Sequence, residues 1–300
     1  MTLNEYVLID IGTSTTKVYT YSQKKLFHVK NQTIFLSEGF TSQNGITTEN
    51  FKKICIIINE AKKNYAGKEV LVFATAIFRK FSDSALEKFK KEFKTETGLD
   101  FKVLSHNEEN LILEEALIDK IPTKVTLLIN IGGGSTELVI MKDKKTIKRE
   151  NINLGVGSII KRFPELVAET TLLRPSEIIN FANDQLPLFE NKTEIAFYTG
   201  GELKYMQAAK YPLTENKLFE DDKHPQIISF EEFSKKNKEI FETKMSELKK
   251  FMPENPEWMT GSRACSALAE TICAKCGIKI IVPSNLNLID GLTKRLEKKN

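Results

Sequence analysis

Two short stretches of the chain carry residue types that can hold an anion. The first reads YVLIDIGTSTTKVYTY over residues 6–21, and the second reads TLLINIGGGSTELVIM over residues 126–141. In each stretch an apolar run contains Asp10 or Asn130 near its end, and a turn of glycine, serine and threonine follows. Glycine lets a ligand approach the backbone closely, and successive N–H groups in a turn form an anion-binding nest. The chemistry that these turns favour is the binding of phosphate.

The two stretches are copies of one pattern, because Asn130 lies 120 residues after Asp10 and the neighbouring residues match at the same offset. An offset this long indicates two domains of related design and not a solenoid. Two such turns facing one another would hold a phosphate chain from both sides. The alternative is that both stretches are ordinary hairpins whose turns bind nothing. The match between the two copies makes this alternative less favoured. The candidate phosphate-binding residues are Gly12, Thr13, Ser14 and Thr15 in the first turn and Gly132, Gly133, Gly134, Ser135 and Thr136 in the second.

The elements that position these turns repeat as well. In the first half, apolar runs predict strands over 6–11, 16–22, 26–34, 69–75 and 101–105, and helical periodicity predicts helices over 47–67, 82–98 and 105–118. In the second half we expect strands near 125–131, 135–141, 146–154, 194–199 and 278–282, and helices from Gly157, from Pro175, and over 230–252, 259–277 and 286–298.

Three strands followed by alternating helices and strands, in both halves, predict an α/β fold that is built twice. Pro122 is the expected boundary, which gives an N-terminal domain over 1–122 and a C-terminal domain over 123–300. Ligands in such sheets bind beyond the carboxyl ends of the strands. We therefore expect the active site in the cleft between the two domains.

Composition places the chain among soluble globular proteins, with 300 residues, 41% hydrophobic and 28% charged. It has no basic leader, no apolar run long enough to cross a bilayer and only four cysteines, so we expect a cytoplasmic protein without membrane or nucleic-acid partners. The net charge of +4 is mild. The basic residues between Lys142 and Arg149 form either a solvated face or a region that attracts a polyanion.

The remaining candidate groups give weaker signals. Cys273 and Cys276 form a CxxC pair that would be redox-active, metal-binding or simply packed in the core, and packing is the more common outcome. The histidines His28, His106 and His224 show no ligand spacing.

Five motifs of the chain form a recognisable set: LIDIGTSTTKVY, INIGGGSTELVI, NINLGVGSIIKRF, FYTGGELKYM and IVPSNLNLIDGL. Together they resemble the exopolyphosphatase / guanosine pentaphosphate phosphohydrolase (Ppx/GppA) family, within the superfamily of acetate kinase, sugar kinases, Hsp70 and actin. The resemblance runs over essentially the whole chain. It implies two actin-like (ribonuclease-H-like) domains and a hydrolase that acts on phosphoanhydrides.

The resemblance also assigns roles to single residues. LSHNEENL is similar to the stretch with the catalytic carboxylate, which implies Glu109, and ATAIFRKF is similar to the motif with a cleft arginine, which implies Arg79. Without the family, Glu109 would be an ordinary partner of its helix dipole and Arg79 a solvated side chain. The family pattern further implies that Gly200, Gly201 and Lys17 bind phosphate, and that Mg²⁺ is held at Asp10, Asn130 and Glu137.

Asn130 is a departure, because the family has aspartate there. The amide keeps the shape but loses the negative charge, so we expect weaker Mg²⁺ binding, unless Asp10 and Glu137 compensate. Leu111 likewise stands where the family has an arginine.

Several functions remain open at this point. The first is an exopolyphosphatase that releases terminal orthophosphate from inorganic polyphosphate. The alternatives are a guanosine pentaphosphate 5′-phosphohydrolase and a weakly active regulator that binds polyphosphate or a nucleotide, with a phosphotransferase less favoured. The partner that these residues indicate is the substrate itself, and a homodimer stays open.

Overall fold

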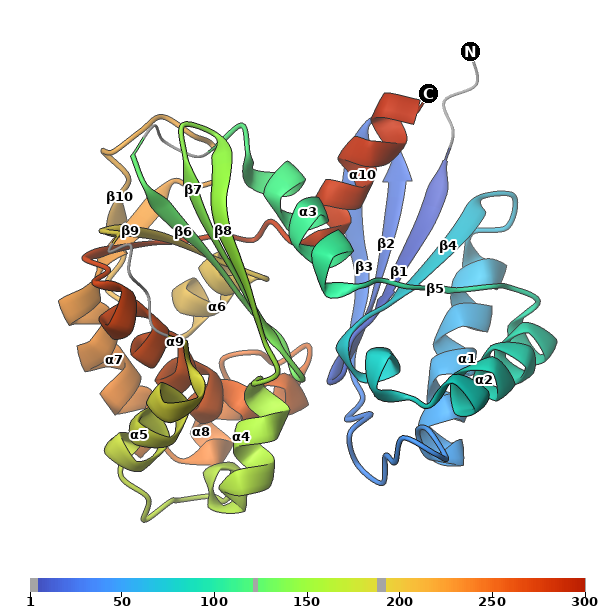
Figure 1. Cartoon of the computed structure of the whole chain (residues 1–300), viewed down its shortest axis with the longest axis horizontal. Coiled ribbons are helices and arrows are strands. Elements are labelled where there is room, and N and C mark those ends of the chain that lie inside the picture. The colour runs from blue at the N-terminus through green and yellow to red at the C-terminus, as the bar shows by residue number, and fades with distance from the viewer. Residues whose placement is uncertain (1–4, 121–123, 188–192, 300) are drawn as a thin grey trace. The chain divides into compact units, whose positions relative to one another are not determined.

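The computed structural model describes residues 5–120, 124–187 and 193–299 (Figure 1). Contacts divide the chain into two compact units. Unit 1 comprises Met1–Glu109 with Leu292–Asn300, and unit 2 comprises Asn110–Gly291. Two helices, α3 (His106–Leu117) and α10 (Leu288–Lys299), contain the points at which the chain passes from one unit to the other.

Unit 1 is built on a five-stranded sheet in the order β3-β2-β1-β4-β5. β1 to β3 are antiparallel, whereas β4 and β5 continue the sheet parallel to β1. The strands are β1 (Tyr6–Ile11), β2 (Thr15–Ser22), β3 (Lys25–Thr33), β4 (Glu69–Ala74) and β5 (Lys102–Val103). The helical segments are α1 (Thr48–Asn64), η1 (Ala76–Lys80) and α2 (Asp83–Thr97).

The helices α1 and α2 pack beside each other (Figure 1), and their apolar faces form the core of unit 1 together with residues of the sheet. Thr47 and Ser82 cap these helices by accepting backbone N–H groups, as their residue types favour. Ile54 of α1 and Phe89 of α2 join buried residues of β1 in one apolar cluster. The helical periodicity seen in the sequence is therefore the buried face of each helix.

Unit 2 is built on a seven-stranded sheet in the order β10-β11-β12-β9-β6-β7-β8. The strands are β6 (Thr126–Ile131), β7 (Thr136–Lys142), β8 (Lys145–Ile152), β9 (Ile195–Thr199), β10 (Thr214–Glu215), β11 (Gln226–Ser229) and β12 (Ile280–Pro283). The helical segments are α4 (Val156–Arg162), η2 (Pro164–Val167), α5 (Pro175–Gln185), α6 (Glu202–Ala208), α7 (Phe230–Glu242), α8 (Met245–Lys249), η3 (Pro256–Gly261) and α9 (Ser262–Cys276).

The sequence repeat is a structural repeat. β1 pairs with β2 so that Asp10 faces Lys17, and β6 pairs with β7 so that Asn130 faces Glu137. The next hairpin turn also matches at the same offset, with Gln23–Lys24 and Asp143–Lys144 all at positive φ. Two residues at positive φ are the geometry that a tight two-residue hairpin requires. The prediction of one design built twice is confirmed.

The expected boundary near Pro122 lies outside the described residues, and the units divide elsewhere, inside α3 and α10. The reason is packing. Leu113 and Leu117 of α3 are buried with Leu128 and Val139 in one apolar cluster of unit 2. Most of α3 therefore belongs to the second unit, although the sequence places the whole helix in the first domain.

The expected helix over 230–252 is wrong as a single element. α7 ends at Glu242, Thr243 is extended, and α8 begins at Met245. The carbonyl of Thr243 accepts a hydrogen bond from the guanidinium of Arg263 at 2.6 Å. This contact with a distant residue stabilises the break, which periodicity alone does not reveal.

No helix among the described residues is both long and apolar enough to span a membrane.

Candidate active site

The turn after β1 leaves backbone donors open. The N–H of Gly12 donates to the carbonyl of Thr15 at 2.9 Å and closes the turn. The carbonyls of Thr13 and Ser14 accept N–H groups from the segment after β3, whereas their own N–H groups have no acceptor within the described residues. Two adjacent open N–H groups in a turn can bind an anion.

Three polar side-chain atoms around this turn are buried without a hydrogen-bond partner in the described part of the chain: Asp10 Oδ1, Thr13 Oγ1 and Thr16 Oγ1. Burial raises the pKa of the Asp10 carboxyl, and the positive charge of Lys17 on the facing strand opposes that effect. Buried polar atoms normally form hydrogen bonds, so these three atoms have capacity left for an ion, a ligand or an ordered water. A cation beside Asp10 and a phosphate beside the threonines fit these atoms.

The turn after β6 has the same backbone pattern. The N–H of Gly132 donates to the carbonyl of Ser135 at 2.8 Å, and the N–H groups of Gly133 and Gly134 have no acceptor among the described residues. The start of α4 packs directly on this turn, because Val156 N donates to Gly132 O at 3.0 Å. A Cβ on Gly155 would lie 2.5 Å from that same oxygen. Gly155, within the motif NINLGVGS, therefore permits the contact.

The side chains of this second turn are engaged inside unit 2. Ser135 Oγ donates to Glu137 Oε1 at 2.7 Å, and Asn130 Nδ2 donates to Glu137 Oε2 at 2.9 Å. The hydroxyl of Thr136 donates to the carbonyl of Leu154 at 2.7 Å. In this arrangement the hydroxyls of Ser135 and Thr136 have no proton left to offer a phosphate. The open backbone N–H groups are the donors that this turn presents.

In the third glycine turn, between β9 and α6, the backbone N–H groups are engaged inside unit 2. Gly200 and Gly201 have φ angles of 110° and 113°, and their N–H groups donate to the carbonyls of Leu286 and Ser284, both at 3.2 Å. They do not present N–H donors. They provide space instead, because a Cβ on Gly201 would meet no atom within 4 Å and one on Gly200 would lie 3.6 Å from Asn130 Oδ1.

Glu109 and Arg79 are brought together in unit 1. Arg79 Nη1 contacts Glu109 Oε2 at 2.7 Å and also donates to the carbonyl of Leu104 at 2.9 Å. Its Nη2 lies 3.2 Å from Nδ1 of His106. The arginine sits on η1, which Ala76 starts at a φ of 26°. Such backbone strain is often found at functional sites.

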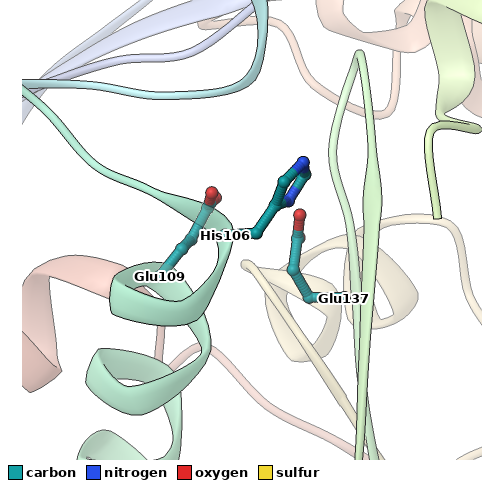
Figure 2. A group of neighbouring side chains, drawn as sticks. All are labelled: His106, Glu109 and Glu137. Carbon is teal, nitrogen blue, oxygen red and sulfur yellow. The ribbon is translucent and has the colours of Figure 1, made fainter. Parts of the chain in front are cut away.

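The first turn of α3 fixes Glu109. Ser105 and Glu108 form the predicted capping box, in which Ser105 N donates to Glu108 Oε2 and Glu108 N donates to Ser105 Oγ. Figure 2 shows His106 and Glu109 on this turn, and Glu137 on β7 of unit 2. Glu109 is 8% exposed, and its contact with Arg79 orients the carboxylate. The sequence gives no signal for the contact of His106 with Arg79, because the two residues lie 27 positions apart.

The CxxC pair is buried in the core of unit 2. Burial raises the pKa of Cys276 to about 12 and raises that of Cys273 well above its ordinary value. A thiol held protonated in this way is a poor nucleophile and a poor metal ligand. The interpretation of these cysteines as packing residues is the one that the structure favours.

These observations define an α/β protein made of two related units, each with two adjacent open backbone N–H groups in the turn after its first strand. The crystal structure of an Aquifex aeolicus member of the Ppx/GppA family has a TM-score of 0.73 at 18% identity, covering 99% of both chains. An exopolyphosphatase from Cytophaga hutchinsonii has a TM-score of 0.80 at 16% identity, covering 99% of this chain and 98% of its own. These likenesses confirm the predicted fold.

The family itself follows from the sequence. The model of the Ppx/GppA phosphatase family matches residues 8–279, and the chain belongs to this family. It is a hydrolase of phosphoanhydrides, as its motifs predict. Among curated proteins, none matches the chain.

Proposed function

We propose that the protein releases terminal orthophosphate from inorganic polyphosphate. The observation that carries the proposal is the repeated turn, which leaves two adjacent N–H groups open at Thr13–Ser14 and again at Gly133–Gly134. Polyphosphate presents one anionic group many times along a chain. A protein that offers the same pair of backbone donors at two turns suits such a ligand.

The chemistry assigned to unit 1 is activation of water. Glu109 orients the water and accepts its proton, while Arg79 fixes the carboxylate through the contact at 2.7 Å. Lys17, on the strand facing Asp10, adds positive charge near the first turn. Phosphoryl transfer depends mainly on positioning and charge stabilisation, so these groups suffice for hydrolysis.

Mg²⁺ is the proposed cofactor. The buried, unpartnered Oδ1 of Asp10 is the donor atom in unit 1 that fits a divalent cation. In unit 2 both oxygens of Glu137 already accept hydrogen bonds, one of them from Asn130. When bound, Mg²⁺ would supply charge neutralisation of the phosphate oxygens. The neutral Asn130 leaves Glu137 satisfied without a metal, which favours weak binding.

Phosphate release measured side by side on long-chain polyphosphate and on guanosine pentaphosphate tests the proposal. We expect faster release from polyphosphate, at a rate that falls in Glu109→Gln. A larger kcat/KM on guanosine pentaphosphate would instead assign the alternative substrate.

A second candidate is a binding regulator with little turnover, and the Asn130–Glu137 hydrogen bond is the observation that favours it. Polyphosphate bound tightly by wild type and by Glu109→Gln, with equal background hydrolysis in both, would support this regulator.

A further inference from the structure

Unit 2 contains a buried chain of hydrogen bonds formed by Asp221, His224 and Ser284, which we call the relay. His224 Nδ1 lies 2.6 Å from Asp221 Oδ2, and His224 Nε2 lies 2.6 Å from Ser284 Oγ. Both His224 and Ser284 are 0% exposed. Lys120 contacts the other oxygen of Asp221 at 2.9 Å, so the relay begins at an ion pair and ends at a serine hydroxyl.

The environment fixes the direction of each hydrogen bond. Burial lowers the pKa of His224, against the influence of Asp221, so the imidazole is neutral at pH 7. Burial acts to raise the pKa of Asp221, but hydrogen bonds from His224, the Lys223 backbone and Lys120 outweigh it and the pKa lies below its usual value. A carboxylate accepts Nδ1–H, which leaves Nε2 as the acceptor of the Ser284 hydroxyl proton.

The same order of groups activates the nucleophile of serine hydrolases, but Ser284 is placed for a different task. Its side chain is fully buried, and its Oγ also accepts the N–H of Leu286 at 3.1 Å. Its main chain faces the third glycine turn. The carbonyl of Ser284 accepts the N–H groups of Gly201 and Glu202 at 3.2 and 3.1 Å, and its N–H donates to Tyr198 O at 2.8 Å.

We propose that the relay positions the Gly200–Gly201 turn, and that Ser284 is the member of the relay that joins it to the turn. The side chain of Ser284 bonds His224 within the relay, and its main chain bonds the turn. The functional part of this inference rests on the proposed function, since it takes the turn to lie against bound phosphate.

The turn has a reason to need such support. Glycine loses more conformational freedom on folding than any other residue, and here two glycines in succession hold positive φ angles. Gly200 lies beside Oδ1 of Asn130, whose Nδ2 donates to Glu137. A shift of the turn therefore reaches the second phosphate turn through Asn130. The relay fixes the turn from a separate segment of the chain.

Hydrogen exchange of peptides covering residues 199–203 tests the proposal directly. Ser284→Ala removes the link, and Asp221→Asn weakens the relay two bonds away while it leaves Ser284 in place. Thr271→Val is the matched control, because the Thr271 hydroxyl is also buried but donates to Ala267 O within α9. We expect about three- to tenfold faster exchange of the turn in the first two variants, and wild-type exchange in the control.

Kinetics give the second readout. If the turn contacts substrate, Ser284→Ala raises KM for polyphosphate by a similar factor of about three to ten, with kcat within about twofold of wild type. Ser284→Thr, which keeps the hydroxyl, restores both exchange and KM.

Unchanged exchange at 199–203 in Ser284→Ala and Asp221→Asn, with melting temperatures lowered as in Thr271→Val, would overturn the proposal. Absence of phosphate release by wild type from either substrate would defeat the proposed function alone, because the exchange measurement needs no turnover.

Discussion

Replacing Asn130 by aspartate probes the second phosphate turn most directly. In the wild type Asn130 Nδ2 donates to Glu137 Oε2 at 2.9 Å, and Glu137 is only 1% exposed. Asn130→Asp removes the donor and places a second carboxylate against the first. The variant must then take up a proton, bind a cation or tolerate two like charges in a buried position.

The free-energy cost of these outcomes can be estimated. Two unit charges about 4 Å apart repel by about 4 kcal/mol at an effective dielectric constant near 20. Protonating a carboxylate with an ordinary pKa near 4 costs about 4 kcal/mol at pH 7, so proton uptake offers little relief. The lost hydrogen bond adds about 1 kcal/mol. For a unit of this size we expect the melting temperature to fall by on the order of 10 °C in chelator.

Thermal unfolding during a Mg²⁺ titration is the assay. Asn130→Asp should regain its melting temperature as Mg²⁺ rises, and its phosphate release should rise in parallel, whereas the wild type responds less to the metal. The double variant Asn130→Asp/Glu137→Gln is the control. It reverses the hydrogen bond without adding charge, so its stability should stay near wild type in chelator. Superimposable melting curves for Asn130→Asp and wild type at every Mg²⁺ concentration would refute the reasoning.

Four other substitutions test the site and its surroundings. Glu109→Gln should lower kcat by about a hundredfold to ten-thousandfold with KM little changed, and undiminished turnover would contradict this role. Arg79→Ala should lower kcat as well as raise KM, because it releases Glu109 from the ion pair. An effect of Arg79→Ala on KM alone would contradict the positioning of Glu109 by Arg79. Gly155→Ala should destabilise unit 2 by about 2 kcal/mol or more, since the new Cβ would lie 2.5 Å from Gly132 O. It should also weaken tripolyphosphate binding, measured by calorimetry. A variant with wild-type binding and melting temperature would show that the turn rearranges at little cost. Folding lowers the pKa of His224, so the unfolded chain binds a proton more readily and stability is lost as the pH falls below about 6.5. The unfolding free energy, measured between pH 7 and 5, should therefore depend less steeply on pH in His224→Gln than in the wild type. An equal pH dependence in the two proteins would assign the effect to another group.

The repeated hairpin could be predicted because its determinants are local. Apolar runs bounded by glycine fix each strand, and the constant offset carries the register of Asp10 with Lys17 over to Asn130 with Glu137. The capping box at Ser105 was predictable for the same reason, since its two members lie three residues apart. Features set by neighbours in the sequence are the ones that a sequence shows.

The break between α7 and α8 could not be predicted in this way. The amphipathic pattern runs through Thr243 without interruption, and the contact that fixes the break comes from Arg263. Arg263 is 1% exposed, and its guanidinium also donates to the carbonyls of Leu166, Ala168 and Glu169. A basic residue in a helical pattern predicts a solvated face, so its burial in a cradle of carbonyls follows only from the fold.

In the candidate site, too, locally determined features could be predicted, and contacts with distant residues could not. Residue types located the two turns, but they could not tell that the hydroxyl proton of Thr136 goes to Leu154 instead of a ligand. The N–H groups of Gly200 and Gly201 are likewise taken by carbonyls far along the chain. The relay has no sequence signal, because Asp221 and His224 meet Ser284 only in the folded unit.

The turns after β1 and β6 differ in how many of their polar side chains already form hydrogen bonds in the absence of a ligand. Around the second turn, Ser135, Asn130 and Thr136 have their hydrogen bonds already, so this turn is preorganised and binding costs little rearrangement. Around the first turn, Asp10 Oδ1, Thr13 Oγ1 and Thr16 Oγ1 have no hydrogen-bond partner among the described residues. By mass action, a ligand or a cation that bonds these atoms would stabilise unit 1. We therefore expect a ligand to add more side-chain hydrogen bonds around the first turn than around the second.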